Sequence, residues 1–211
     1  MHPPSPRSRR ALAVLTATAC ALVGLTTLAP RAEAAATAPA DHLIITEVYG
    51  GGGNAGATLT HDFVELYNPT SAPIDLTGYV VRYYSAAGNL GNTCALSGTI
   101  APGSHHLIQQ AKGNGGTQPL PTPDTICTAA MGAATGSVLL SNADGDVDLV
   151  GYGTVKLYEG APTEALSNTT SASRLSFADT DNNAADFAPG TPNPRNSGGV
   201  DPDPARPRAG T

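Results

Sequence analysis

The chain has 211 residues, with 17 acidic and 11 basic side chains and a net charge of −6. This balance argues against nucleic acid as a partner, because nonspecific affinity for nucleic acid comes from Lys and Arg side chains that neutralise phosphates. The 24 glycines and 18 prolines disfavour long helices and favour short strands joined by turns.

Residues 1–34 have the pattern of a secretory signal peptide. Basic side chains lie within the first ten residues, and residues 11–29 form an apolar run without a charge. Small residues follow and offer Ala32-Glu33-Ala34 or Ala36-Thr37-Ala38 as cleavage sites. An N-terminal membrane anchor is the alternative, since the run is close to the ~20 residues that span a bilayer. We expect cleavage, secretion to the extracellular space and no transmembrane segment in the mature protein.

Cleavage near Ala34 leaves about 177 residues, enough for one domain that buries roughly 70% of its unfolded surface. We assign residues 35–40 to a flexible N-terminal segment and residues 41–197 to this domain. Residues 198–211 belong to a Pro-rich stretch without apolar periodicity, for which we predict a disordered tail. The mature protein is more acidic than the precursor, with 7 basic and 16 acidic residues and a net charge of −9, because cleavage removes Arg7, Arg9, Arg10, Arg31 and Glu33.

Six segments of the domain read as strands. Taken in chain order, they are "HLIITEVY" (42–49), "DFVELYN" (62–68), "GYVVRYYS" (78–85), "SHHLIQQ" (104–110), "SVLLSN" (137–142) and "DVDLVGYG" (146–153). Alternation with period two is typical of strands, and turn signals such as "NADGD" separate the segments. Only "PTEALSN" (162–168) could form a turn or two of helix. The pattern predicts an all-β, antiparallel sandwich or barrel.

The glycines after the first strand raise the question of a nucleotide site. Gly51, Gly53 and Gly56 satisfy G-x-G-x-x-G, the fingerprint of a dinucleotide-binding turn. That turn needs a helix whose N-terminus holds the pyrophosphate. Here the glycines lead into "ATLTHDFVELYN", which alternates like a strand. We therefore predict a surface connection between two strands, either structural or part of a recognition site.

Two cysteines remain after cleavage, Cys94 and Cys127. In an oxidising exterior we expect them to form a disulfide, which contributes roughly 3–4 kcal/mol in the chain-entropy model. A metal or redox pair is the alternative, but the spacing is not C-x-x-C and no further ligands lie nearby in sequence.

Acidic residues gather in two places. One group is Asp144, Asp146 and Asp148, and the other is Asp179, Asp181, Asn183 and Asp186. Clustered carboxylate and amide oxygens suit calcium, so we take the second group as a candidate for structural calcium, although it departs from the EF-hand pattern. The alternative is a solvated loop with local side-chain turns. If residues 146–149 form a strand, Asp146 and Asp148 should share its outer face.

The sequence contains no nucleophile, base or metal motif of a known hydrolase type, so we assign no catalytic residue. His61 and Asp62 are adjacent, and neighbours in a strand point to opposite faces. A small hydrolase remains an alternative, because a catalytic triad needs only proximity in space. We also assign no required cofactor.

The ordered succession of "IITEVYGGGGNAGATLTHDFVELYNPTSAPIDLTGYVVRY", "LSGTIAPGSHHLIQQ", "ATGSVLLSN", "DLVGYG" and "DTDNNAADFAPGTPNPRNS" resembles the lamin-tail domain of secreted bacterial proteins. The resemblance runs over about residues 41–197. It implies an immunoglobulin-like β-sandwich without catalytic residues, of the version often found before extracellular endonuclease/exonuclease/phosphatase domains. The sequence departs from that arrangement after Thr211, so we expect no such enzyme domain in this chain.

The resemblance favours a secreted, non-catalytic module for binding, adhesion or display, with an unknown protein or cell-surface ligand as partner. Loops at residues 50–60 and 112–123 would provide the recognition surface, because irregular segments on a rigid scaffold commonly do. The alternative is an accessory domain that works with a separately encoded nuclease or phosphatase. We expect a monomer.

Overall fold

The computed structural model describes residues 38–199, so the predicted signal peptide and nearly all of the predicted tail lie outside the described residues. The elements in chain order are β1 (Ile44–Tyr49), β2 (His61–Tyr67), β3 (Ile74–Asp75), β4 (Val80–Tyr84), β5 (Leu90–Ala95), β6 (Thr99–Ile100), β7 (His105–Lys112), β8 (Thr125–Ile126), β9 (Gly136–Asn142), β10 (Gly145–Tyr152), β11 (Ser171–Arg174), α1 (Asn183–Asp186) and β12 (Phe187–Gly190). Among these residues, the structure has no helix with the length and apolar character needed to cross a membrane.

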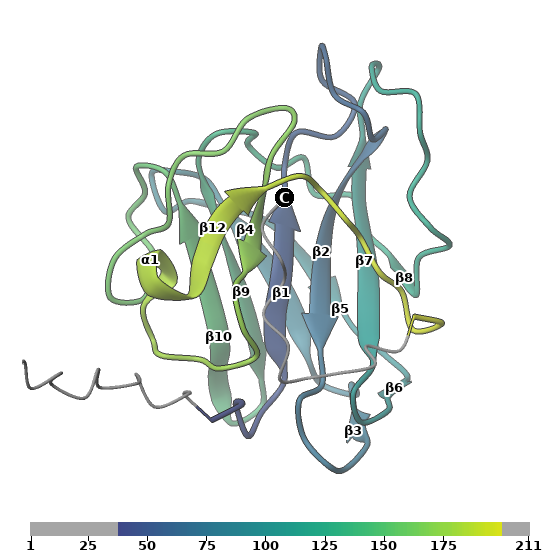
Figure 1. Ribbon diagram of the computed structural model, residues 1–211, viewed down its shortest axis with the longest axis vertical. Coiled ribbons are helices and arrows are strands. Elements are labelled where there is room, and N and C mark those ends of the chain that lie inside the picture. The colour runs from purple at the N-terminus through teal and green to yellow at the C-terminus, as the bar shows by residue number, and fades with distance from the viewer. Residues whose placement is uncertain (1–37, 200–211) are drawn as a thin grey trace, which may run out of the picture. The chain divides into compact units, whose positions relative to one another are not determined.

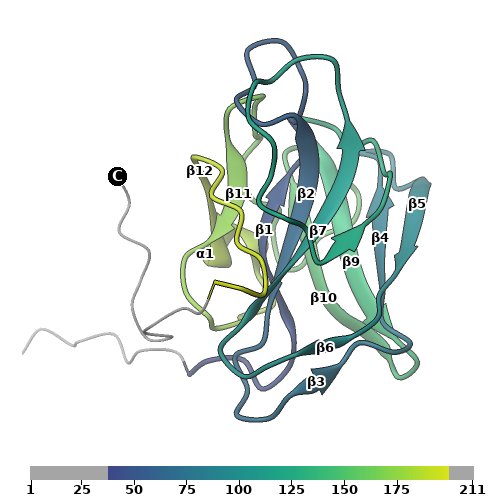
Figure 2. The ribbon, with the colours of Figure 1, turned by 90° about the vertical axis from the view of Figure 1, so that its right-hand side faces the viewer.

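Two sheets face each other and form a sandwich (Figures 1 and 2). One sheet has the strand order β12-β11-β1-β2-β7-β8, and the other has the order β10-β9-β4-β5. The strand pairs of both sheets are antiparallel apart from β7 with β8. The predicted antiparallel, immunoglobulin-like β-sandwich is confirmed.

The main core lies between the two sheets. β1 is buried along its whole length, as its nearly continuous apolar sequence predicts for a strand covered on both faces. Val48 on β1 and Leu66 on β2 belong to the same core cluster as Val81 on β4 and Leu140 on β9. Alternate residues of β2, β4 and β9 thus supply the shared core, whereas a register shift between Ile45 and Glu47 interrupts the alternation in β1.

A disulfide joins Cys94 to Cys127, with their Cα atoms 6.0 Å apart, which confirms the predicted pair. Cys94 lies on β5, an edge strand of the four-stranded sheet. Cys127 directly follows β8, an edge strand of the six-stranded sheet. The bond therefore fastens the two sheets to each other along one side of the sandwich.

The prediction for β10 was wrong in one respect. Asp146 is exposed, but Asp148 is only 1% exposed and does not share an outer face with it. The register between β10 and β9 shifts between these two residues, which marks a β-bulge. A bulge adds a residue on one strand and re-aims the side chains that follow, so strict alternation does not hold across it.

The segment 162–168, which could have formed a turn or two of helix, contains none. Thr163 forms an isolated bridge with Tyr152, and Ser167 forms one with Thr170. The single helical turn among the described residues is α1, which interrupts the chain between β11 and β12.

Residues 191–199 cross the outer face of the six-stranded sheet (Figure 1). The backbone N–H of Asn193 donates to Glu47 Oε1 at 2.9 Å, and that of Arg195 donates to Glu65 Oε2 at 2.6 Å. Ser197 donates to both oxygens of Asp124. Glu47 and Glu65 are fully buried beneath this segment. The Pro-rich stretch is thus held by the sheet as far as it is described.

Candidate functional site

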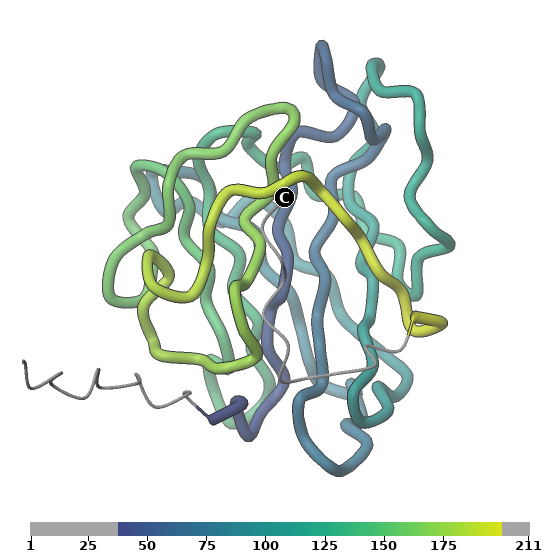
Figure 3. Tube along the Cα trace, viewed as in Figure 1, coloured from purple at the N-terminus to yellow at the C-terminus, as the bar shows by residue number. Residues whose placement is uncertain are grey.

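Three loops meet at one end of the sandwich (Figures 1 and 3). They are residues 50–60 between β1 and β2, residues 113–123 between β7 and β8, and residues 167–170 before β11. Asn168 Nδ2 donates to Ala55 O at 2.9 Å, which ties the third loop to the first. The two segments that the sequence suggested for recognition therefore lie side by side, together with a third that it did not suggest.

Backbone hydrogen bonds join the first two loops to each other. Gly115 N donates to Gly53 O at 2.6 Å, and Thr60 N donates to Gln118 O at 3.0 Å. Such bonds between loops replace water at both groups and hold the connection in one conformation. The loops at this end of the sandwich are therefore held in place by contacts within the protein.

The glycines of the first loop serve this close contact between backbones. A Cβ on Gly52 would lie 1.9 Å from the carbonyl carbon of His61, and one on Gly53 would lie 2.2 Å from Gly113 Cα. Gly53 also has a φ of +66°, which side chains disfavour. The chain continues from Gly56 into β2, not into a helix. The interpretation of these glycines as a strand connection, and not a dinucleotide turn, is confirmed.

Asp62 holds the base of the same loop. Its Oδ1 accepts a hydrogen bond from Gly52 N at 2.8 Å, and its Oδ2 accepts one from Met131 N at 2.9 Å. Burial raises the pKa of Asp62 to about 6, although both hydrogen bonds oppose the shift. The His61 ring contacts Thr60 Oγ1 at 2.8 Å. Asp62 thus supports the loop and does not orient His61 as a base.

A hollow of about 190 Å³ lies among these loops, and Tyr49 of β1 and residues 191–192 complete its wall. Small-molecule sites usually measure about 300–1,000 Å³, so the hollow has room for a single side chain of a partner. Its lining mixes an aromatic ring, an aliphatic side chain and hydroxyl and amide groups from Tyr49, Thr58, Leu59, Gln118, Thr169, Thr191 and Pro192.

A buried histidine and carboxylate lie on the six-stranded sheet. His105 Nδ1 is 3.1 Å from Glu65 Oε1, and both side chains are 0% exposed. The Tyr67 ring packs 4.7 Å from the His105 ring, and the Phe177 ring stacks on Tyr67 at 4.0 Å. A substrate cannot reach this pair, so its role is structural.

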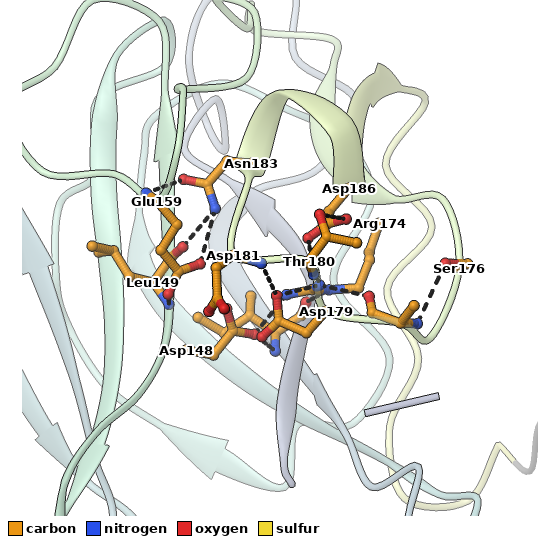
Figure 4. Close-up of polar contacts among 12 residues, drawn as sticks. Asp148, Leu149, Glu159, Arg174, Ser176, Asp179, Thr180, Asp181, Asn183 and Asp186 are labelled. Carbon is orange, nitrogen blue, oxygen red and sulfur yellow. Dashed lines mark hydrogen bonds and ion pairs between the residues drawn. The ribbon is translucent and has the colours of Figure 1, made fainter. Parts of the chain in front are cut away.

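A second group of polar residues forms an acidic cluster of Asp148, Glu159 and Asp179 (Figure 4). The three residues come from β10, from the loop that follows β10 and from the loop between β11 and α1. One carboxylate oxygen of each lies within 4.8 Å of the other two. Asp148 is fully buried, and the other two are partly buried.

Two basic side chains contact the acidic cluster. Arg174 Nη2 donates to Asp148 Oδ2 at 2.7 Å, and its Nε donates to Ile45 O at 2.7 Å. The Arg174 side chain is 1% exposed, and its guanidinium lies 4.5 Å from the centre of the Phe187 ring. His42 Nε2 is 3.2 Å from Asp179 Oδ2. Arg174 is the central cation of this region.

The carboxyl groups of the cluster differ in acidity. Burial raises the pKa of Glu159 to about 8, and the charges of Asp148 and Asp179 add to the shift. Burial also raises the pKa of Asp148 to about 6, against the opposing charge of Arg174. Burial disfavours the charge on Asp179 too, but its hydrogen bond with His42 and the charge of Arg174 outweigh it and hold its pKa well below its usual range. The same hydrogen bond raises the pKa of His42 to about 9.

The four residues of the predicted calcium group have different surroundings. Asp179 belongs to the acidic cluster. Asp181 is exposed, with a φ of 51° and its N–H directed at Asp179 Oδ1. Asn183 Oδ1 accepts hydrogen bonds from Gly151 N and Glu159 N.

Asp186, the fourth residue of the group, accepts hydrogen bonds from Thr180 and lies 3.5 Å from Arg174 Nη1. Asn183 and Asp186 therefore brace the loop around Asp179. The calcium assignment of this group stays a prediction.

Sequence reasoning missed the partners of Asp179. Asp148 was noted as acidic but placed on the wrong face, and Glu159 and Arg174 were not singled out. The one local signal was Arg174 in the short polar sequence "SASR". This sequence forms β11, which lies between β12 and β1, and a charged side chain buried at such a position needs oppositely charged or hydrogen-bonding partners.

A family model described as Lamin Tail Domain matches residues 36–154, which is more than half of the chain. The chain belongs to the lamin tail domain family. This confirms the resemblance drawn from the sequence, while the secreted bacterial setting stays a prediction. No match was found among curated proteins.

The lamin tail domain is an immunoglobulin-like and non-enzymatic family, which agrees with a module that lacks catalysis. The match spans β1 to β10 and contains Asp148. Glu159, Arg174 and Asp179 lie beyond it, so the acidic cluster joins the matched part to the strands that follow.

Proposed function

We propose that this lamin tail domain is a secreted, non-catalytic module that binds a protein at the cell exterior through the loop end at residues 50–60, 113–123 and 167–170. The observation behind the proposal is the mutual hydrogen bonding of these loops around a hollow that suits one side chain. A surface that is ordered before binding loses less conformational entropy when a partner docks. Recognition by loops on a rigid sandwich is also a common use of such scaffolds.

The net charge of the chain supports a protein partner and not a nucleic acid, because acidic side chains repel phosphates. Secretion rests on the signal-peptide pattern of residues 1–34. N-terminal sequencing of the protein recovered from culture medium tests it, and an intact Met1 on cell-bound protein would contradict secretion.

The binding function is tested with the full chain as bait against the secreted and cell-surface proteins of its source cells. Gln118→Arg and Thr169→Arg place long side chains at the hollow, and both residues are exposed, so neither change disturbs the core. Ser97→Arg is the matched control, because Ser97 is exposed in the turn between β5 and β6, at the opposite end (Figure 1).

We expect a partner that the wild type and Ser97→Arg retain equally and that either hollow variant binds at least about tenfold more weakly, as for a residue at the centre of an interface. Equal retention by all variants would place recognition elsewhere. Capture of a nuclease or phosphatase would favour the accessory role. Turnover of nucleic acid, glycan or phosphoester by the pure protein would contradict the non-catalytic assignment.

A further inference from the structure

The acidic cluster contains more negative than positive groups. Its two basic partners are Arg174 and His42. The carboxylates in and around the cluster are more numerous: Asp148, Glu159, Asp179, Asp181 and Asp186. Like charges held this close repel one another, and partial burial strengthens the repulsion. Protons or a cation must neutralise the excess.

One oxygen of the acidic cluster lacks a hydrogen-bond donor. Asp148 Oδ2 accepts hydrogen bonds from Ile45 N at 2.6 Å and from Arg174 Nη2. Asp148 Oδ1 is buried and has no hydrogen-bond partner among residues 38–199, although the side chain is 0% exposed. An unsatisfied carboxylate oxygen inside a protein is costly, so such an atom points to a ligand.

Figure 4 shows the side chains of Asp148, Glu159 and Asp179 gathered at one point, with one carboxylate oxygen of each within 4.8 Å of the other two. We infer that Asp148, Glu159 and Asp179 bind one calcium ion, which the free Oδ1 of Asp148 ligates directly. The site overlaps the group predicted from the sequence only at Asp179.

The ligand chemistry favours calcium, and the spacing is compatible with it. Carboxylate oxygens are hard ligands, which suit Ca²⁺ and Mg²⁺. Oxygens on opposite sides of Ca²⁺ are about 4.6–5.2 Å apart. The oxygens of the cluster lie within 4.8 Å of one another, inside the span of Ca²⁺ ligands. Mg²⁺ keeps several waters and is usually bound through one or two carboxylates, so three protein carboxylates suit Ca²⁺ better.

Arg174 and Asn183 explain how the site is shaped before the ion arrives. Arg174 turns Asp148 by holding its Oδ2, and this leaves Oδ1 free. Asn183 Nδ2 donates to Glu159 Oε2 at 3.3 Å and to Leu149 O at 2.7 Å, which fixes the loop after β10 against that strand. Residues that orient metal ligands in this way act as positioning residues.

Calorimetric titration of the full chain with CaCl₂, after removal of bound metal by a chelator, tests the site. We expect one ion per chain with a Kd of about 10⁻⁴–10⁻³ M, the range of extracellular calcium modules. At ~10 mM CaCl₂ and a Kd of ~10⁻⁴ M, the unfolding equilibrium constant should fall about 100-fold, which thermal denaturation measures as a higher Tm. MgCl₂ should bind more weakly.

Glu159→Gln removes one ligand charge and keeps an oxygen for the hydrogen bond from Leu149 N. Burial already disfavours the Glu159 charge, so the metal-free variant should fold at least as stably as the wild type. Glu164→Gln is the matched control, since it makes the same chemical change at an exposed residue of the same connection. We expect Glu159→Gln to bind Ca²⁺ at least about tenfold more weakly and Glu164→Gln to bind like the wild type.

Absence of saturable binding by the wild type below about 10 mM CaCl₂ would overturn the site without reference to any variant. Equal affinities of the two variants would do the same, and tighter binding of Mg²⁺ would overturn the assignment to calcium. None of these results tests the proposed partner binding by the three loops, because the partner-binding assay and the calcium titration alter different residues.

Discussion

Replacing Arg174 with Met tests whether this buried cation holds the acidic loops to the sheet. Met keeps much of the side-chain volume but removes every donor of the guanidinium. Asp148 loses its ion-pair partner, and the carbonyl groups of Ile45 and Ala178 lose the N–H groups 2.7 and 3.0 Å away. The favourable contact with the Phe187 ring is also lost.

The size of the effect follows from burial. Removing one partner of a buried ion pair costs about 3–5 kcal/mol, and each buried carbonyl left without a donor costs about 1–3 kcal/mol, with incomplete additivity. We expect Arg174→Met to lower the free energy of unfolding by about 4–5 kcal/mol at pH 7, a large part of the ~5–15 kcal/mol of a typical domain. At pH 5 the loss should be smaller, because Asp148, whose pKa is already raised to about 6, takes up a proton.

Urea denaturation of the metal-free protein at both pH values measures these differences from the midpoint and slope. Arg82→Met is the matched control, because Arg82 is half-buried and donates to the side chain of Ser141. We expect it to cost about 1 kcal/mol at either pH. If Arg174→Met costs no more than Arg82→Met, or costs the same at pH 5 and pH 7, the reasoning from the buried charge is wrong.

Two further predictions concern the acidic cluster and the glycine loop. The folded-state pKa of Glu159 is raised from 4.5 to about 8, so its contribution to the unfolding free energy is present at low pH and is lost as the pH rises from about 4.5 to about 8. Glu159→Gln should reduce this loss of unfolding free energy with rising pH, measured by urea titrations of the metal-free protein at several pH values. An unchanged pH dependence would assign the loss to other groups. Gly52→Ala should cost about 3 kcal/mol or more, because the new Cβ meets the His61 backbone, whereas Gly56→Ala, at a φ of +80° in open space, should cost about 1 kcal/mol. Similar urea midpoints for both alanine variants would show that the loop shifts away from the His61 backbone at little cost.

Apart from β5, the strands with five or more residues were the ones that sequence reasoning found, because they are long enough to show a period. β1, β2, β4, β7, β9 and β10 each have five or more residues and were predicted. β3, β6 and β8 have two residues each, too few for alternation, and β5 was partly taken for a turn because of its Gly and Asn residues. Short strands form because a neighbouring strand offers hydrogen bonds, and the local sequence does not report that neighbour.

The candidate calcium residues show the same limit. Sequence reasoning grouped Asp179 with acidic residues a few positions away, as calcium loops do. In the fold, Asp179 faces Asp148 and Glu159, and the bulge in β10 is what places Asp148 inside. A bulge changes which face a side chain occupies without altering the composition of the strand.

By itself, the sequence determined the all-β class, the partner of each of the two cysteines and the strand that follows the glycines. The class and the strand follow from local periodicity, and the disulfide follows because only two cysteines remain after cleavage of the signal peptide. The tertiary structure alone decided that three loops share one end and that Arg174 lies among carboxylates from separate segments. The physical reason is that burial and charge act between groups that meet only after the sheets pack, and residue spacing along the chain does not contain those distances.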